Sequence, residues 1–135
     1  MFEILRNHKT WLVYTPLVLY WLLIFTLTTL PTTSIPDVGI GDKISHFLAY
    51  FGLAVLVNLT FQLQEKYNQL RRRSHLYTIL IVALYGFFDE LHQLLIPGRI
   101  CAFDDWVANI VGGVVGILFI IFLEKFDSKY FSEVK

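Results

Sequence analysis

Long apolar runs alternate with short polar segments along the chain, and this pattern predicts the elements of the fold. Each of four apolar stretches approaches the length of about 20 residues that a helix needs to cross the hydrocarbon core of a bilayer. The stretches are hydrophobic on nearly all sides, which is typical of membrane helices rather than of amphipathic helices in soluble domains. We therefore predict an all-α fold, an integral membrane four-helix transmembrane bundle, with helices over about residues 10–30, 44–63, 76–96 and 106–123.

Short connections leave little room for a second domain, so residues 1–135 are expected to form a single transmembrane domain. The first stretch follows a mildly basic segment, as the apolar part of a signal peptide does. It is longer than such a part, and Leu27–Thr33 lacks a good cleavage site, so we expect it to remain as a helix. Gly112 and Gly116, four residues apart in the last stretch, predict a close approach between two helices.

Composition agrees with a membrane protein, since 56% of the residues are hydrophobic and 16% are aromatic. Soluble domains are nearer 45–50% apolar. The net charge is zero and no basic stripe is present, which argues against nucleic acid as a partner. The single cysteine, Cys101, excludes a disulfide within the chain.

Basic residues predict the orientation, because Lys and Arg accumulate in the cytoplasmic loops of membrane proteins. Four spans place nine of them on one side, namely Arg6, Lys9, Lys66, Arg71, Arg72, Arg73, Lys125, Lys129 and Lys135. Only Lys43 and Arg99 remain on the other side. We therefore expect a multi-pass protein of the cytoplasmic (inner or plasma) membrane with both termini cytoplasmic and with segments 31–43 and 97–105 facing outward.

Acidic residues gather on the opposite, external side, in or near the outer halves of the helices: Asp37, Asp42, Asp89, Glu90, Asp104 and Asp105. They belong to three short polar motifs, which read Asp42-Lys43-x-x-His46, then Asp89-Glu90-x-His92-Gln93 followed by Pro97-Gly98-Arg99, and Asp105-x-x-x-Asn109. The first and third motifs have i,i+4 spacing, which places both residues on one helix face.

Each motif also has a structural explanation. Asp42 and Asp105 could be helix N-caps, Pro97-Gly98 could end a helix with a turn, and Asn109 could form a hydrogen bond between helices. Glu90 is harder to explain in this way, because it is predicted to lie about six residues, or roughly 9 Å, inside its helix. An ionised carboxylate at a helix centre costs about 2.5–3.5 kcal/mol on the insertion scale, so such groups are functional candidates.

The chain direction brings the motifs together at the outer ends of three helices. Asp89 points about 100° away from Glu90 around the helix, so the two carboxylates are expected to have different partners. Lys43 or Arg99 could pair with a carboxylate and lower the free-energy cost of its burial. We predict an outward-facing polar cavity whose ligand-binding residues are Asp42, Lys43, His46, Glu90, Gln93, Arg99, Asp105 and Asn109.

These motifs, together with Phe47, Tyr85-Gly86, Ala108 and the two glycines, resemble the VanZ-like family in order and spacing over about residues 10–123. That family is named for a protein that confers resistance to the glycopeptide teicoplanin, and its members are small bacterial membrane proteins. The resemblance implies an envelope protein that binds a lipid-linked or amphipathic ligand, such as an envelope precursor or a lipoglycopeptide, and that is linked to antibiotic resistance.

An alternative is a membrane enzyme, a hydrolase or transferase, that acts on a lipid head group. Its catalytic candidates are Glu90 as general base, His46 as acid or base, and Asp105. A divalent metal would offset the surplus of carboxylates, and Asp42, His46, Glu90 and Asp105 offer suitable donors for Zn, Mn or Mg. A transporter or channel subunit, and buried polarity with a purely structural role, are the remaining interpretations.

Overall fold

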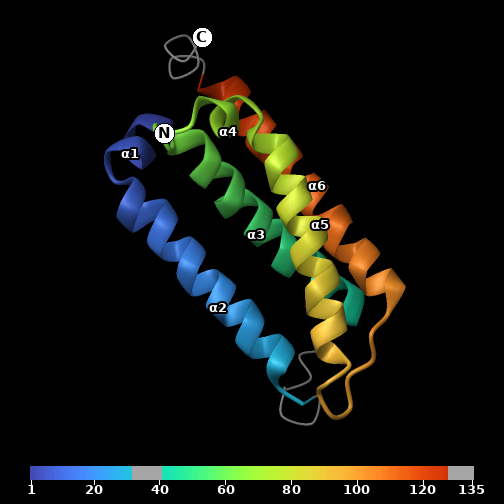
Figure 1. Ribbon diagram of the computed structural model, residues 1–135. Coiled ribbons are helices and arrows are strands. Elements are labelled where there is room, and N and C mark those ends of the chain that lie inside the picture. The colour runs from blue at the N-terminus through green and yellow to red at the C-terminus, as the bar shows by residue number, and fades with distance from the viewer. Residues whose placement is uncertain (32–40, 128–135) are drawn as a thin grey trace.

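The computed structural model describes residues 1–31 and 41–127, and these residues form helices and no strands (Figure 1). The elements are α1 (Phe2–Asn7), the π-helical turn η1 (Thr10–Tyr14), α2 (Thr15–Thr29), α3 (Asp42–Leu63), α4 (Asn68–Arg72), α5 (Ser74–Gln93) and α6 (Phe103–Phe126). The predicted all-α class is confirmed. The four long segments match the four predicted ranges to within one turn at each end.

Three helices of the described residues are long and apolar enough to cross a membrane, namely Thr10–Thr29, Asp42–Leu63 and Phe103–Phe126. Helix α5 has 20 residues but is not among them. Polar residues at both of its ends lower its mean hydropathy, from Ser74 and His75 at the start to Gln93 at the end. Length and composition therefore support three of the four predicted spans.

Helices α3 and α6 touch backbone to backbone through the predicted small-residue face. A Cβ atom added to Gly112 would lie 2.2 Å from the carbonyl oxygen of Phe47, and one added to Gly116 would lie 2.7 Å from that of Phe51. Only glycine fits at such separations, so the close approach expected from the two glycines is confirmed. This contact holds the first turns of α3 and α6 beside each other.

Helix α2 lies at the side of the other long helices and packs against α3 and α5 (Figure 1). Ile24 is the one residue of α2 that is buried, and it joins a core formed with Leu53 and Val57 of α3 and Val82 of α5. Much of the remaining α2 surface is exposed and apolar, as at Leu19. Exposed apolar side chains of this kind suit contact with lipid.

Buried polar residues join α3, α5 and α6 near the end where α4 lies. Asn58 donates a hydrogen bond to Thr78 Oγ1 (3.1 Å), and Gln62 donates one to Asn58 Oδ1 (2.8 Å). Gln62 also donates to Glu124 of α6. Amides and hydroxyls of this kind are common structural links between membrane helices and do not stand out in the sequence.

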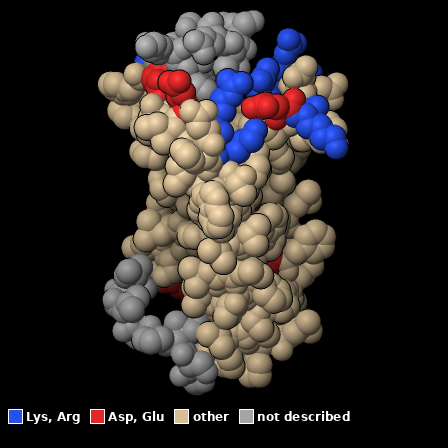
Figure 2. Space-filling view, turned by 90° about the vertical axis from the view of Figure 1, so that its left-hand side faces the viewer, with Lys and Arg blue, Asp and Glu red and all other residues tan. Residues whose placement is uncertain are grey.

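The same end of the molecule carries most of the basic residues. The backbone N–H of Phe2 donates to Asp127 (2.9 Å), and Lys9 donates to Glu65 (3.2 Å), so the start of the chain meets the ends of α3 and α6. Figure 2 shows Lys and Arg gathered there, beyond a band without charges at its surface. Among the described residues, Lys and Arg gather at this end as predicted, with Lys43 and Arg99 at the other end. Asp37, Lys129 and Lys135 lie outside the described residues.

Candidate functional site

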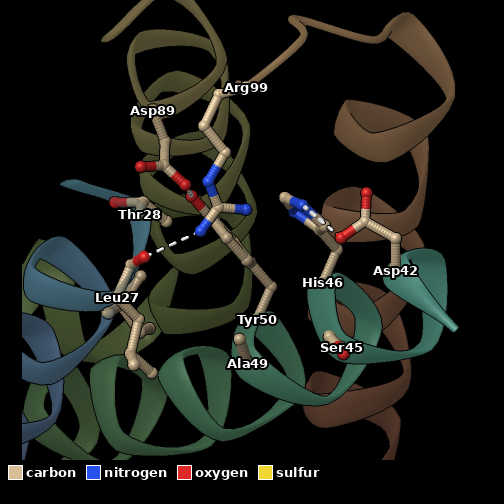
Figure 3. Close-up of a pocket in the computed structure, with 10 residues that line it drawn as sticks. Leu27, Thr28, Asp42, Ser45, His46, Ala49, Tyr50, Asp89 and Arg99 are labelled. Carbon is tan, nitrogen blue, oxygen red and sulfur yellow. Dashed lines mark hydrogen bonds and ion pairs between the residues drawn. The ribbon is translucent and has the colours of Figure 1, made fainter. Parts of the chain in front are cut away.

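A cavity of about 230 Å³ lies at the opposite end of the molecule, between α2, α3, α5 and the segment that follows α5 (Figure 3). We call it the polar pocket. Its lining residues are Ile24, Leu27, Thr28, Asp42, Ser45, His46, Ala49, Tyr50, Asp89 and Arg99. Its wall on α2 is largely apolar, while α3, α5 and Arg99 provide most of the polar groups.

One face of α3 carries the first polar wall of the pocket. Asp42, His46 and Tyr50 follow one another at four-residue intervals, and adjacent turns of a helix place such residues on one face. His46 Nε2 lies 3.9 Å from Asp42 Oδ1, as Figure 3 shows. The shared face expected for Asp42 and His46 is present, and Tyr50 extends it.

The interpretation of Asp42 and Asp105 as N-caps is wrong. The N-cap residues of α3 and α6 are Gly41 and Ala102, and neither helix has a side-chain cap hydrogen bond. Asp42 is the first residue of α3 and Asp105 the third of α6, so both lie within the first turn of their helices rather than at the N-cap. Near a helix N-terminus they are still favoured by the helix dipole.

His46 links α3 to α6 and α5 behind the pocket wall. Its Nδ1 atom lies 3.0 Å from Asn109 Oδ1, within hydrogen-bond distance, and 3.8 Å from Glu90 Oε1. All three side chains are buried. Because the two atoms that face Nδ1 are oxygens, the neutral ring is expected to carry its proton on Nδ1 and a lone pair on Nε2.

Asp89 and Glu90 have different partners, as expected from their directions on the helix. The Tyr50 hydroxyl donates to Asp89 Oδ2 (3.1 Å), and the backbone N–H of Ala102 donates to Glu90 Oε2 (3.1 Å). The predicted depth of Glu90 is wrong, because α5 ends at Gln93 and Glu90 therefore lies in its last turn. Glu90 is nevertheless only 3% exposed, since neighbouring protein covers it.

The two basic residues at this end do not pair with the buried carboxylates. Lys43 forms an ion pair with the exposed Asp104. Arg99 donates from Nη2 to the carbonyl oxygen of Leu27 (2.8 Å) and from Nε to that of Leu30 (3.3 Å). The last carbonyls of a helix lack partners within it and carry the negative end of the dipole, which explains why a guanidinium binds there.

The structure brings most of the predicted ligand-binding residues together. Asp42, His46 and Arg99 line the pocket. Glu90, Asp105 and Asn109 lie close to His46, behind the wall. The predicted residues outside this group are Lys43, which is turned toward Asp104, and Gln93, which is buried but does not line the pocket.

Three buried polar atoms of these residues have no hydrogen-bond partner among the described residues. They are Oε1 of Glu90, Nε2 of Gln93 and Nδ2 of Asn109. Buried polar groups in proteins are usually paired, so unpaired ones are frequent where a protein binds something else.

Tyr50 and Thr28 are pocket residues that the sequence analysis missed, and Asp89 was not among its predicted ligand-binding residues. The four-residue spacing after His46 could have pointed to Tyr50. Thr28 had no comparable signal, because an apolar helix such as α2 does not reveal which of its sides faces the protein.

Three of the four predicted metal donors form a compact group. One ligand atom each from Asp42, His46 and Asp105 lies within 4.8 Å of the other two. Carboxylate oxygen and imidazole nitrogen are donors for Zn²⁺ and Mn²⁺. Glu90 is not part of this group, since it faces the other ring nitrogen of His46.

Comparison with known proteins agrees with the motifs. A family model described as VanZ/LLP1 matches residues 9–124, a range that includes all of the pocket residues. No match was found among curated proteins or among solved structures.

Proposed function

The chain belongs to the VanZ/LLP1 family, and from that premise we propose that it is an envelope membrane protein whose polar pocket binds the head group of a lipid-linked or amphipathic molecule. The observation that carries the proposal is the wall of buried polar side chains, from His46 to Asp89, beside a cavity of about 230 Å³. Ionisable groups such as these are costly inside a membrane, which makes them functional candidates by default.

The proposed orientation places the pocket in the outer leaflet of the cytoplasmic membrane. Most of the Lys and Arg lie at the opposite end, which supports cytoplasmic termini by the positive-inside tendency. We take α5 as a fourth span, because Leu80, Leu84 and Phe88 on its surface are exposed and apolar. The pocket would then open where the head groups of lipid-linked molecules lie.

The walls of the pocket suit an amphipathic ligand. Ile24 and Leu27 of α2 present apolar surface opposite the polar residues of α3. A second, apolar cavity of about 330 Å³ is lined by Val18, Trp21, Leu22, Phe25 and Tyr85. Both cavities are lined by α2, so this helix offers apolar surface for the chain attached to a head group in the polar pocket.

Native mass spectrometry of gently purified protein tests the proposal. We expect a lipid-linked molecule to copurify with the wild type and with Asp104→Asn, whose side chain is exposed and lies outside the pocket. Glu90→Gln, which keeps the shape but removes the ionisable group behind His46, should retain much less of it. Spectra without a ligand, or with equal amounts in all three proteins, would count against the proposal.

A link to glycopeptide resistance, with teicoplanin as the test drug, follows from the same proposal. Deletion of the gene should change the minimum inhibitory concentration of a lipoglycopeptide, and wild type but not Glu90→Gln should restore it. If a verified deletion leaves susceptibility unchanged, the protein has no role in resistance to that drug, and the binding proposal is unaffected.

The pair formed by His46 and Glu90 favours a second candidate function, catalysis on a lipid head group. Both side chains are buried, and His46 Nδ1 lies 3.8 Å from Glu90 Oε1, a separation from which an acid and a base can cooperate in proton transfer after a small movement. Incubation of purified protein with lipid-linked phosphates tests it. Turnover should fall in His46→Gln and in Glu90→Gln, and the absence of turnover in the wild type would exclude hydrolysis or transfer of those substrates.

A further inference from the structure

We propose that Asp42, His46 and Asp105 bind one divalent metal ion, Zn²⁺ or Mn²⁺, and that this ion holds a phosphate-bearing head group in the polar pocket. The second half of the proposal rests on the proposed function, whereas the metal site stands on the side chains alone. The three residues come from the first two turns of α3 and α6, and their donor atoms lie within 4.8 Å of one another. Zinc binds oxygen and nitrogen donors at about 2.0–2.2 Å, so small rotations of the side chains would close such a group around one ion.

The surroundings of His46 prepare one of its ring nitrogens for a metal. Asn109 Oδ1 and Glu90 Oε1 both face Nδ1, which favours a proton on that atom. The lone pair is then on Nε2, the nitrogen that faces Asp42 at 3.9 Å. Metal-binding histidines in proteins usually donate their other ring N–H to an oxygen in this way, because the bond fixes the tautomer and the direction of the ring.

Asp105 supplies an observation that does not depend on the spacing of the group. Its side chain is buried, with 5% of the residue exposed, yet no described residue donates a hydrogen bond to its carboxylate. The nearby Lys43 pairs with Asp104 instead. A carboxylate held mostly out of water without a protein donor is unfavourable, and a second carboxylate beside it adds repulsion. A divalent cation between Asp42 and Asp105 would remove both penalties.

The donor set selects the class of metal. Two carboxylates and one imidazole combine hard oxygen with borderline nitrogen, which suits Zn²⁺ or Mn²⁺ better than Ca²⁺, which prefers oxygen ligands alone, or Cu⁺, which prefers sulfur. Three protein ligands leave coordination positions for another molecule. Because Asp42 and His46 also line the pocket, a phosphate there could reach the ion.

The ion would also make the pocket able to accept an anion. Two carboxylates repel a phosphate group, whereas two carboxylates with a divalent cation are neutral as a set. Arg99 also lines the pocket, but its Nη2 and Nε donors are already used by the carbonyl oxygens of Leu27 and Leu30, so it has fewer hydrogen bonds to offer a phosphate.

Metal binding is tested on protein in detergent after treatment with a chelator. Mn²⁺ is followed by electron paramagnetic resonance and Zn²⁺ by elemental analysis after dialysis, and we expect one equivalent in the wild type. Asp42→Asn and Asp105→Asn should each weaken binding by at least about tenfold.

Asp42 is exposed, so its variant should fold even if the other does not. Asp104→Asn is the matched control, an adjacent carboxylate outside the group, and should bind as the wild type does.

The metal site is overturned if the wild type binds less than one equivalent, or if Asp42→Asn binds as tightly as the wild type. The role in head-group binding is tested separately by native mass spectrometry before and after chelation. Loss of the copurified lipid on chelation, and its return with Zn²⁺ or Mn²⁺, is the expected result. Lipid that stays bound without metal would overturn this role and leave the proposed function standing, whereas protein that binds metal but no lipid would overturn the proposed function and leave the metal site standing.

Discussion

His46 Nδ1 lies 3.0 Å from Asn109 Oδ1, a contact between residues 63 positions apart that joins α3 to α6 in a buried part of the protein. The contact orients the imidazole so that Nε2 faces Asp42 and the pocket. The same ring therefore belongs both to the packing between two helices and to the candidate site. Changes to Asn109 should affect stability as well as binding.

Asn109→Ala removes the acceptor and leaves the His46 N–H buried without it. We expect the free energy of unfolding to fall by about 1–3 kcal/mol, the usual penalty for an unsatisfied buried polar group. Ser45→Ala is the control, because Ser45 is exposed and immediately precedes His46. Urea unfolding in detergent micelles measures both variants. Equal stability of the two would show that the contact with Asn109 does not support the fold.

Gly112→Ala should push α3 and α6 apart. The new Cβ would lie 2.2 Å from the Phe47 carbonyl oxygen, and a backbone atom cannot move aside as a flexible side chain can. Overpacking typically lowers the free energy of unfolding by about 1–3 kcal/mol, and we expect Gly112→Ala to lower it by at least the upper end of that range. Gly41→Ala is the matched change, since nothing lies within 4 Å of its Cβ position. A thermal unfolding midpoint for Gly112→Ala no lower than that for Gly41→Ala would contradict the close contact.

Arg99→Gln should loosen the last turn of α2. Its guanidinium donates to the carbonyls of Leu27 and Leu30, and glutamine lacks both the charge and the reach. Hydrogen exchange of the amides near Leu30 should become at least severalfold faster, while exchange in the first half of α2 stays unchanged. Lys43→Gln removes an exposed ion pair and should not alter exchange in α2. Exchange near Leu30 that is insensitive to Arg99 would show that the guanidinium does not hold this turn.

Glu65 offers a test of the contacts at the opposite end. A hydrogen bond from Lys9, helped by the charges of Lys9 and Arg6, holds the pKa of the Glu65 carboxyl below its ordinary value. Because the pKa is lower in the folded state, these contacts stabilise the fold above the unfolded pKa of about 4.3, and the contribution is lost as the pH falls through the folded value.

Lys9→Gln should therefore raise the pKa of Glu65 toward its ordinary value. A titration of the carboxyl group by nuclear magnetic resonance measures the shift directly. Lys125→Gln, a basic residue at the end of α6, serves as the control and should leave the pKa of Glu65 where it is in the wild type. A pKa that is the same with and without Lys9 would refute the assignment.

The sequence predicted the helices because long apolar runs are visible in the order of the residues, and it predicted which candidate residues share a helix face because spacing determines the face. Asp42 and His46 were placed on one face by spacing alone, and the two glycines of α6 identified a real contact with α3. The depth of Glu90 was wrong because the apolar residues Leu94–Ile96 continue the hydropathy of α5 beyond its last helical turn.

Hydrogen-bond and ion-pair partners that lie on different helices could not be predicted in the same way. Arg99 binds backbone carbonyls of α2. Every residue has a backbone carbonyl, so residue identity does not show which carbonyls accept these hydrogen bonds. Lys43 directly follows Asp42 in the sequence, yet the placement of α6 pairs it with Asp104 instead. Pairing across long separations is decided by packing, whereas faces of a single helix are decided by spacing.

The contrast between the rigid contact of α3 with α6 and the sparse burial of α2 has a consequence for protein engineering. The glycine contact leaves no freedom to adjust the wall that holds His46 and Asn109. On the facing wall, Ile24 of α2 is packed in the core, whereas Leu27 and Thr28 are not buried. Substitutions at Leu27 and Thr28 should therefore change ligand preference while the chemistry of the opposite wall stays constant.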